Sequence, residues 1–272
     1  MKIKISICAL FVSLCLQVYG QSTQQVVHEL MEKSGSTSLF KQLDNLLYSK
    51  LEEKRSSFKN DEDFKTFVAL MKTGINSMDA EKYFVDYFEL KTNEDSLKKV
   101  IALYNEPLMI EMTLLEVSTN DPSQQQDQQS FFEGLKKNPP SQTRIQQLVL
   151  LNNELGTSEL LSKMFTNMAL SMAKGFNSVQ PAENQVPLNE LKEKIQSTFN
   201  SDFSIMMTNQ IIALSMYTYK SVDDSKLNEY IKVWQSPVGK YFVKNTYNAL
   251  DYSFSKMFEQ LGSSMKIFDK SK

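Results

Sequence analysis

The small number of turn-forming residues constrains the fold of this chain more than any other feature of its sequence. Its 272 residues include only 8 glycines and 7 prolines, whereas a β-sandwich of this length would need many more between its strands. Leucine, methionine, lysine, glutamine and glutamate, which all favour helices, are common. The composition therefore predicts an all-α protein.

Apolar residues recur at steps of three and four along most of the chain, which is the period of a helix that buries one face. Leu39 and Leu43 begin one such run, for which Thr37 or Ser38 is the expected N-terminal cap. Asn60 is the expected cap of the following helix. Other helices are predicted near 78–91, 97–104, 107–117, 188–200, 202–219, 223–235 and 237–261.

Residues 1–20 have the layout of a secretory signal peptide. Lys2 and Lys4 give a positive start, residues 5–16 are nearly all apolar, and Gly20 is a small residue at the expected cleavage point. The apolar stretch is shorter than the roughly 20 residues that a membrane-spanning helix needs. We therefore expect an exported protein that is cut after Gly20 and is not an integral membrane protein.

Removal of the expected signal peptide would change the chemistry of the chain. Cys8 and Cys15 both lie within it, so the rest of the sequence has no thiol for catalysis, a disulfide or a metal. The alternative is a lipoprotein, but lipidation of a cysteine needs a small residue directly before it. Each cysteine here follows a large apolar residue, so lipidation is not expected. The 30 basic residues fall to 28 against 32 acidic ones, a net charge of −4. This mild negative charge argues against nucleic-acid binding.

Two blocks of the second half repeat blocks of the first half in the same order. A shift of 121 residues pairs Leu30 with Leu151, Gly35 with Gly156 and Leu39 with Leu160. A shift of 130 residues pairs Leu97 with Leu227, Tyr104 with Trp234 and Pro107 with Pro237. We attribute the difference between the two shifts to an insertion in the second copy, in a loop expected around 175–187.

The repeat predicts two tandem, related multi-helix units packed as helical bundles. The first unit covers 21–120 and is the degenerate copy, and the second covers 142–265. Residues 121–141 are expected to form a polar, proline-containing linker with a short helix. A duplicated helical unit is usually a packing module, so the repeat favours a binding role over catalysis.

The segment Val222–Phe242 contains acidic residues, an apolar helix, an aromatic residue and then Ser-Pro-x-Gly. These features lie at Asp223, Asp224, Leu227, Ile231, Trp234, Ser236, Pro237 and Gly239. The pattern resembles the C-terminal signature of a bacterial family, domain of unknown function 2059, and the likeness covers about 138–262. The first half has Tyr104 and Pro107, with Glu106 and Met109 in place of the serine and glycine.

The resemblance implies export to the periplasm or outer envelope of a Gram-negative bacterium, a helical fold and no assigned activity. On physical grounds, Ser236 is a good helix cap, Pro237 fits a first helical turn, and Gly239 permits a close approach. We therefore expect a tight corner between two packed helices, directly after Trp234. The alternative is an anion site at the helix N-terminus, with Lys240 nearby.

The stretch Phe203–Tyr219 contains no charged residue. We expect it to form a central helix that is buried on most sides. The alternative is that its flexible and apolar side chains line a groove for an apolar ligand or a partner segment. The residues expected in such a groove are Met206, Met207, Ile211 and Met216.

We find no set of residues in the sequence that predicts catalysis, a cofactor or a metal site. The one histidine, His28, is expected on a helix surface near Glu32. Acid pairs occur at Glu52–Glu53, Asp61–Asp63 and Asp223–Asp224, where helix starts and solvated faces explain them.

The leading hypothesis is an exported, non-enzymatic binding or interaction protein with an unknown protein or envelope partner. One alternative is the carriage of a small apolar molecule in a helical cavity. A less favoured alternative is an envelope hydrolase, which would need two acids, or His28 with a hydroxyl, in one cleft.

Overall fold

The computed structural model describes residues 22–135, 137–178 and 180–270, and the regular elements in these ranges are all helical. This confirms the all-α prediction. The expected signal peptide, residues 1–20, lies outside the described residues.

The first half contains α2 (Ser22–Lys33), α3 (Ser36–Glu52), the 3-10 turn η1 (Arg55–Ser57), α4 (Asp61–Gly74), α5 (Ser77–Lys91), α6 (Glu94–Tyr104) and α7 (Pro107–Thr119). The second half contains η2 (Pro122–Gln124), α8 (Gln125–Leu135), α9 (Gln142–Leu155), α10 (Thr157–Ser178), η3 (Ala182–Asn184), α11 (Leu188–Thr198), α12 (Ser201–Thr218), α13 (Asp224–Gln235) and α14 (Pro237–Lys270).

Short polar side chains start several of these helices. The Asn60 Oδ1 atom accepts a hydrogen bond from the Asp63 N–H at 2.8 Å, which confirms the expected cap of α4. Asn93 caps α6 and Asp223 caps α13 in the same way, each through the N–H three residues later. These bonds satisfy backbone donors that have no partner within the helix.

The start of α3 differs from the prediction. Gly35, with φ of 75°, takes the cap position without a side-chain hydrogen bond, so the expected cap at Thr37 or Ser38 is wrong. A left-handed glycine ends α2 and lets the chain enter α3 at once. The loop predicted from residue 175 also begins later, because α10 continues through Gly175 to Ser178.

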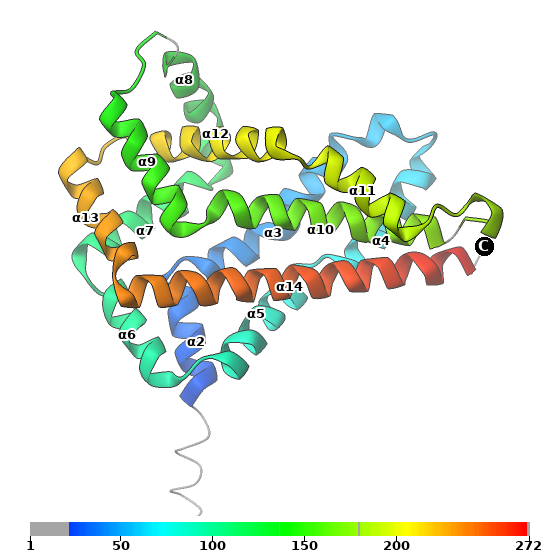
Figure 1. The fold of residues 1–272 in the computed structure, drawn as a ribbon, viewed down its shortest axis with the longest axis horizontal. Coiled ribbons are helices and arrows are strands. Elements are labelled where there is room, and N and C mark those ends of the chain that lie inside the picture. Colours follow the sequence, from blue (N-terminus) through cyan, green and yellow to red (C-terminus); the bar gives the residue numbers. More distant parts are fainter. Residues whose placement is uncertain (1–21, 136, 179, 271–272) are drawn as a thin grey trace, which may run out of the picture.

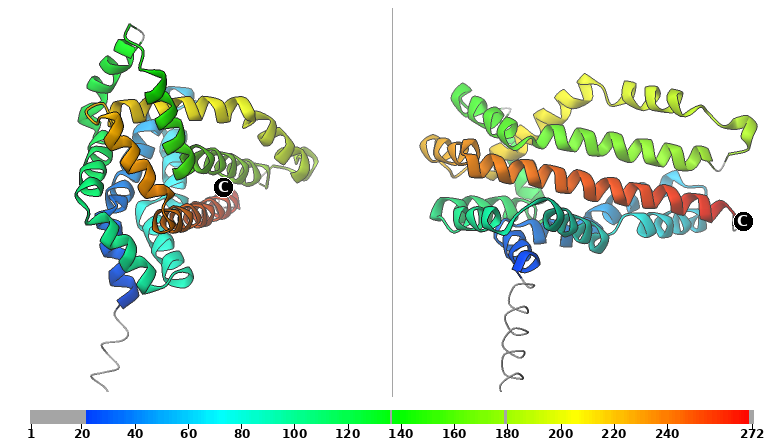
Figure 2. Two further views of the ribbon diagram at one scale, coloured as in Figure 1. Left: turned by 60° about the vertical axis from the view of Figure 1, so that its left-hand side comes forward. Right: turned by 60° about the horizontal axis from the view of Figure 1, so that its bottom comes forward.

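The longest helices lie side by side along the longest axis of the molecule. Figures 1 and 2 show α14 next to α10, and the two helices are in extensive contact. On its other side α14 packs on α4 and α5. Helix α14 runs to Lys270, beyond the end predicted near 261. Because it contacts α10 as well as α4 and α5, it joins the first half of the chain to the second.

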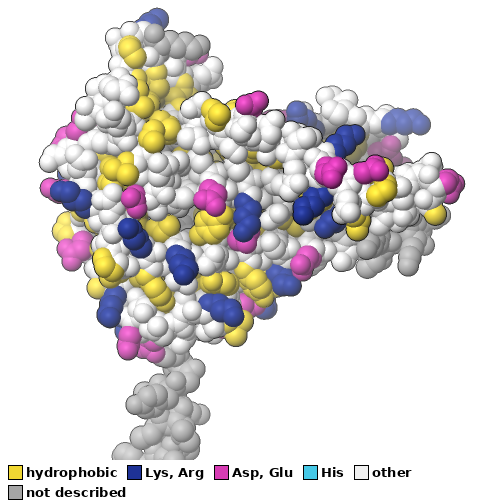
Figure 3. Space-filling view, in the orientation of Figure 1, with side chains coloured by type: hydrophobic (Ala, Val, Ile, Leu, Met, Phe, Trp, Pro, Cys, Tyr) yellow, Lys and Arg dark blue, Asp and Glu magenta, His cyan; other side chains and the backbone are white. Residues whose placement is uncertain are grey.

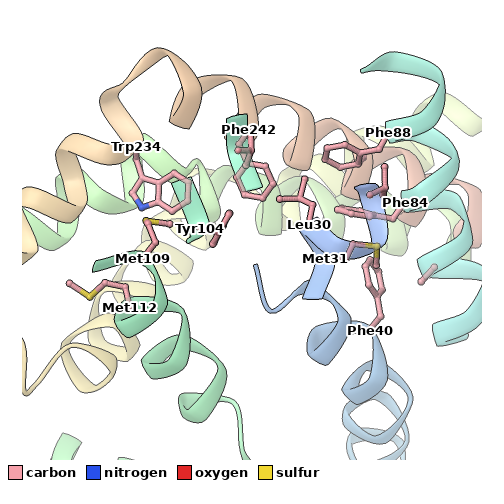
Figure 4. Close-up of a cluster of buried hydrophobic side chains, with 14 of the residues drawn as sticks. Leu30, Met31, Phe40, Phe84, Phe88, Tyr104, Met109, Met112, Trp234 and Phe242 are labelled. Carbon is pink, nitrogen blue, oxygen red and sulfur yellow. The ribbon is translucent and has the colours of Figure 1, made fainter. Parts of the chain in front are cut away.

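One apolar core runs through both halves. Leu30 and Phe88 of the first half and Phe242 and Leu261 of the second belong to the same cluster of buried side chains. Figure 4 shows Trp234 and Phe242 beside Tyr104, with Leu30, Phe84 and Phe88 further along the cluster. The structure therefore does not separate into two independent bundles.

The two halves nevertheless repeat several geometric features. Gly35 and Gly156 are the two described residues with positive φ, and each joins a short helix to a longer one. Helix α2 contacts α3, α5 and α6, and α9 contacts α10, α12 and α13 in the same order. Pro107 and Pro237 each begin the last helix of a half.

Helix α12 lies near the upper edge of the molecule in Figure 1, below α8 and above α10. Only Ile212 and Tyr217 of this helix are buried, while Ile205 and Met206 are 59% and 46% exposed. The expectation of a central helix buried on most sides is therefore wrong, because α12 packs against its neighbours through one side only. Among the described helices, none combines the length and the apolar character that crossing a membrane requires.

Candidate functional site

A cavity of about 450 Å³ lies between the two halves of the chain. Helix α7 of the first half and helices α10, α12, α13 and α14 of the second contribute to its wall. Its apolar part includes Leu155, Leu160, Leu161, Ile211, Phe242 and Leu250. Leu39, Asn120 and Leu214 also line the cavity and are exposed, so the cavity reaches solvent on their side.

One carboxyl group lies in the wall of this cavity, on Glu116 of α7. Its Oε1 atom accepts a hydrogen bond from the Tyr219 hydroxyl at 2.6 Å and a second one from the Tyr230 hydroxyl. Both tyrosines are almost fully buried. The three side chains therefore form a hydrogen-bonded cluster in a wall that contains apolar side chains together with several serines and threonines.

Burial raises the pKa of Glu116, and the hydrogen bonds from Tyr219 and Tyr230 oppose that rise. Burial, together with the nearby Glu116 carboxylate, also raises the pKa of Tyr104, Tyr219 and Tyr230 well above the ordinary tyrosine value. All three phenols therefore stay protonated near neutral pH, and the two that bond to Glu116 act as donors.

No basic side chain compensates the charge of Glu116 among the described residues. The cavity wall contains Glu116 but no lysine, arginine or histidine. None of the ion pairs in the described part of the chain includes Glu116, and no cation contributes to the shift of its pKa. An ionised Glu116 would therefore be a carboxylate without a counter-charge.

Several aromatic side chains line the same cavity as this carboxyl group. The Trp234 ring lies edge-on to Tyr230 at 5.6 Å and stacks on Phe242 at 6.2 Å between ring centroids. Tyr104 packs against both Trp234 and Phe242, as Figure 4 shows. Such contacts stabilise the cluster beyond the burial of its area.

Two polar atoms in the residues of the wall have no hydrogen-bond partner. They are the Trp234 Nε1 and the Thr246 Oγ1 atoms, and both are buried. A buried donor without an acceptor destabilises the folded state.

Helix α9 holds the segment that carries Tyr219. The Arg144 guanidinium, whose side chain is 13% exposed, pairs with Asp224 at 3.0 Å. It also donates to the backbone carbonyls of Tyr219 and Val222. Gln147 donates to the Asp224 carbonyl at 2.9 Å. These bonds fix the connection between α12 and α13 and so position the Tyr219 hydroxyl next to Glu116.

The Ser-Pro-Val-Gly segment forms the expected corner between α13 and α14. The Ser236 hydroxyl accepts a hydrogen bond from the Gly239 N–H at 3.1 Å, and Pro237 begins α14. A Cβ atom on Gly239 would lie 2.2 Å from the Val233 carbonyl oxygen, so only glycine fits this approach. The corner places Trp234 on one side and Phe242 on the other, both in the cavity wall.

The four predicted groove residues do not gather in one place. Ile211 lines the cavity, and Met216 packs against the apolar core. Met207 is half-buried, while Met206 lies in a shallow surface depression with Ile205. These four residues lie on different faces of α12, because successive residues of a helix point in different directions around its axis.

Glu116, Tyr219 and Tyr230 are not among the site residues predicted from the sequence. Glu116 lies in the largely apolar segment 107–119, and an acid in such a segment was the available signal. Its partners lie 103 and 114 residues away, so their meeting depends on the tertiary fold.

The residues considered for catalysis lie elsewhere. His28 is exposed on α2, and the acid pairs that the sequence offers are absent from the cavity wall. Within the described ranges, no group of three or more histidines, cysteines or acids could hold a metal ion. The cavity brings together one carboxyl group and several phenols, which is a set suited to recognition.

Exposed apolar side chains are distributed over many helices. In Figure 3 they form several small groups among charged and polar side chains. The most exposed examples are Met78, Leu90, Leu114 and Ile205. No single surface patch on this face therefore matches the cavity as a candidate site.

Comparison with known proteins identifies no relative. No protein-family model, no curated protein and no solved structure matches this chain. The resemblance of 138–262 to the family of domain of unknown function 2059 stays a prediction.

Proposed function

We propose that this chain is an exported, non-enzymatic binding protein of the Gram-negative envelope, and that the cavity between its halves is the binding site. The observation that carries the proposal is the cavity itself, with apolar walls around a single carboxyl group and its two phenol donors. Ligand sites typically combine such walls with a few convergent polar groups.

The size of the cavity supports a small ligand. Its volume of about 450 Å³ lies within the roughly 300–1,000 Å³ of typical small-molecule sites. The exposed residues Leu39 and Leu214 on its lining offer a route from solvent. The volume and the route from solvent therefore favour one form of the binding hypothesis, in which the protein carries a small, largely apolar molecule.

We also infer that the two halves are diverged copies of one helical unit. The inference is supported by the left-handed Gly35 and Gly156, by the prolines that open α7 and α14, and by the matching helix contacts. In this arrangement the ligand cavity lies where the copies meet. Tyr104 and Trp234 occupy equivalent positions of the two copies, and their side chains are in direct contact in the cavity wall.

A cavity-filling substitution tests the binding site. We expect Ile211→Trp to reduce the binding of a neutral, environment-sensitive dye such as Nile red by at least tenfold, because the indole would occupy the cavity. Ile205→Trp is the matched control, since Ile205 lies on the same helix and is 59% exposed. Equal dye binding by both variants, or no binding by the unaltered protein, would contradict the proposal.

Export is tested separately by fractionation and N-terminal sequencing of the protein made in a Gram-negative host. We expect the periplasmic or outer-envelope fraction to contain a chain that begins at Gln21. A chain that keeps residues 1–20 and stays in the cytoplasm would contradict this part of the proposal.

A further inference from the structure

We propose that the ligand of this cavity is an organic ammonium ion with an apolar body, whose cationic head lies next to Glu116. The proposal rests on the proposed function, because it names the chemical class that the same cavity would bind. Three features of the cavity support it: the charge of its wall, the aromatic rings around the carboxyl group and the apolar remainder.

The first feature is the unbalanced carboxyl group. The two phenol hydrogen bonds both end on Oε1 of Glu116, and no described residue donates to Oε2. Glu116 is half-buried and has no cation beside it, so its carboxylate gains from a nearby positive charge. An ammonium group can supply the missing positive charge next to Oε2.

The second feature is the aromatic surround. Tyr104, Tyr219, Tyr230, Trp234 and Phe242 all belong to the cavity wall. Aromatic faces attract cations, and rings of this kind are used to bind quaternary ammonium groups. A carboxylate that lines the same cavity as these rings therefore favours a cationic head over a neutral or an anionic one.

The third feature is the remainder of the wall. Leu155, Leu160, Leu161, Ile211 and Leu250 line the cavity away from the polar cluster. They match an alkyl chain but offer no charged partner. A fatty acid would place a second negative charge in a cavity that has no basic side chain. An alcohol would fit the walls without balancing the charge of Glu116.

The test compares three probes with the same chain: octyltrimethylammonium, octanol and octanoate, with the two ionic probes below the concentration at which they form micelles and octanol below its solubility limit. Trp234 is the only tryptophan of the chain and lines the cavity, so its fluorescence reports occupancy, and calorimetry gives the affinity. We expect octyltrimethylammonium to bind at least tenfold more tightly than octanol, and octanoate to bind most weakly.

Glu116→Gln is the decisive variant, because the amide oxygen can still accept the hydrogen bonds from Tyr219 and Tyr230. We expect it to reduce the affinity for octyltrimethylammonium at least tenfold and to leave octanol binding unchanged. Glu111→Gln is the matched control on the same helix, because Glu111 is exposed and pairs with Lys226 at the surface. This control should not change the affinity for any probe.

The possible results separate the two proposals. Equal affinity for octyltrimethylammonium and octanol, no effect of Glu116→Gln, or a preference for octanoate would overturn the ammonium ligand and leave the cavity as a binding site. Failure of all three probes to bind, together with failure of the neutral dye, would overturn both proposals. If Glu116→Gln does not fold, the ranking of the three probes on the unaltered protein decides.

Discussion

Substitution of Gly74 by alanine tests how closely α14 packs on the first half of the chain. Gly74 ends α4, and a Cβ atom there would lie 2.4 Å from the Leu261 Cα atom and 2.8 Å from its backbone nitrogen. Ordinary contacts need about 1 Å more, and the obstacle is backbone that cannot change rotamer. Helix α14 would have to move, although α10 and α5 also hold it.

Overpacking of this kind costs about 1–3 kcal/mol, and alanine returns about 0.5–1 kcal/mol in a helix. We therefore expect Gly74→Ala to lower the free energy of unfolding by up to about 2.5 kcal/mol. For a chain of this size each kcal/mol corresponds to about 2–4 °C in the melting temperature. Urea unfolding followed by circular dichroism measures the change.

Gly134→Ala is the control for this experiment. Gly134 also lies in a helix, α8, but no atom lies within 4 Å of the position its Cβ would take. We expect this variant to be as stable as the unaltered protein or slightly more stable, since alanine is the better helix former. A Gly74→Ala variant that is equally stabilised would refute the close packing of α14 on α4.

The other predictions concern the cavity and its supports, and urea unfolding measures each of them. Arg144→Ala should lower the free energy of unfolding by about 2–4 kcal/mol, because the carbonyls of Tyr219 and Val222 lose a charged donor. Arg55→Ala is the control and should leave the free energy of unfolding nearly unchanged, because the Arg55 ion pairs are exposed. Burial raises the pKa of the Glu116 carboxyl group in the folded state above its value in the unfolded chain. The carboxyl group therefore stabilises the folded state fully at a pH below the unfolded pKa, and this contribution is lost as the pH rises through the folded pKa. The stability of Glu116→Gln relative to the unaltered protein should therefore increase with pH over that range, and a constant difference would contradict the raised pKa of Glu116. Thr246→Val should stabilise the protein by up to about 1 kcal/mol, because it removes a buried hydroxyl that has no partner; destabilisation would show that the hydroxyl has one.

Local features of the fold could be predicted where one residue type determines the backbone. Asn60 starts α4 and Pro107 starts α7, as the sequence indicates. The Ser236 corner follows from the same kind of signal. These predictions succeed because each depends on capping or on backbone dihedral angles within a few residues.

Features that depend on tertiary packing could not be predicted in this way. The segment Phe203–Tyr219 is apolar around much of its circumference, so its composition suggests burial although α12 lies at the edge. The cavity is a second case, because Glu116 meets Tyr219 and Tyr230 across more than a hundred residues. Helical spacing describes which face of a helix is apolar but not which distant helix covers it.

The central claim is that a cationic, amphipathic ligand occupies the cavity between the two halves. A crystal structure of the protein with octyltrimethylammonium tests it most directly. The account predicts the ammonium group in contact with Glu116 and the aromatic rings of Tyr230 and Trp234, and the octyl chain along Leu160 and Ile211. A structure in which protein side chains fill this cavity, and the ligand is absent or lies on the outer surface, would contradict it.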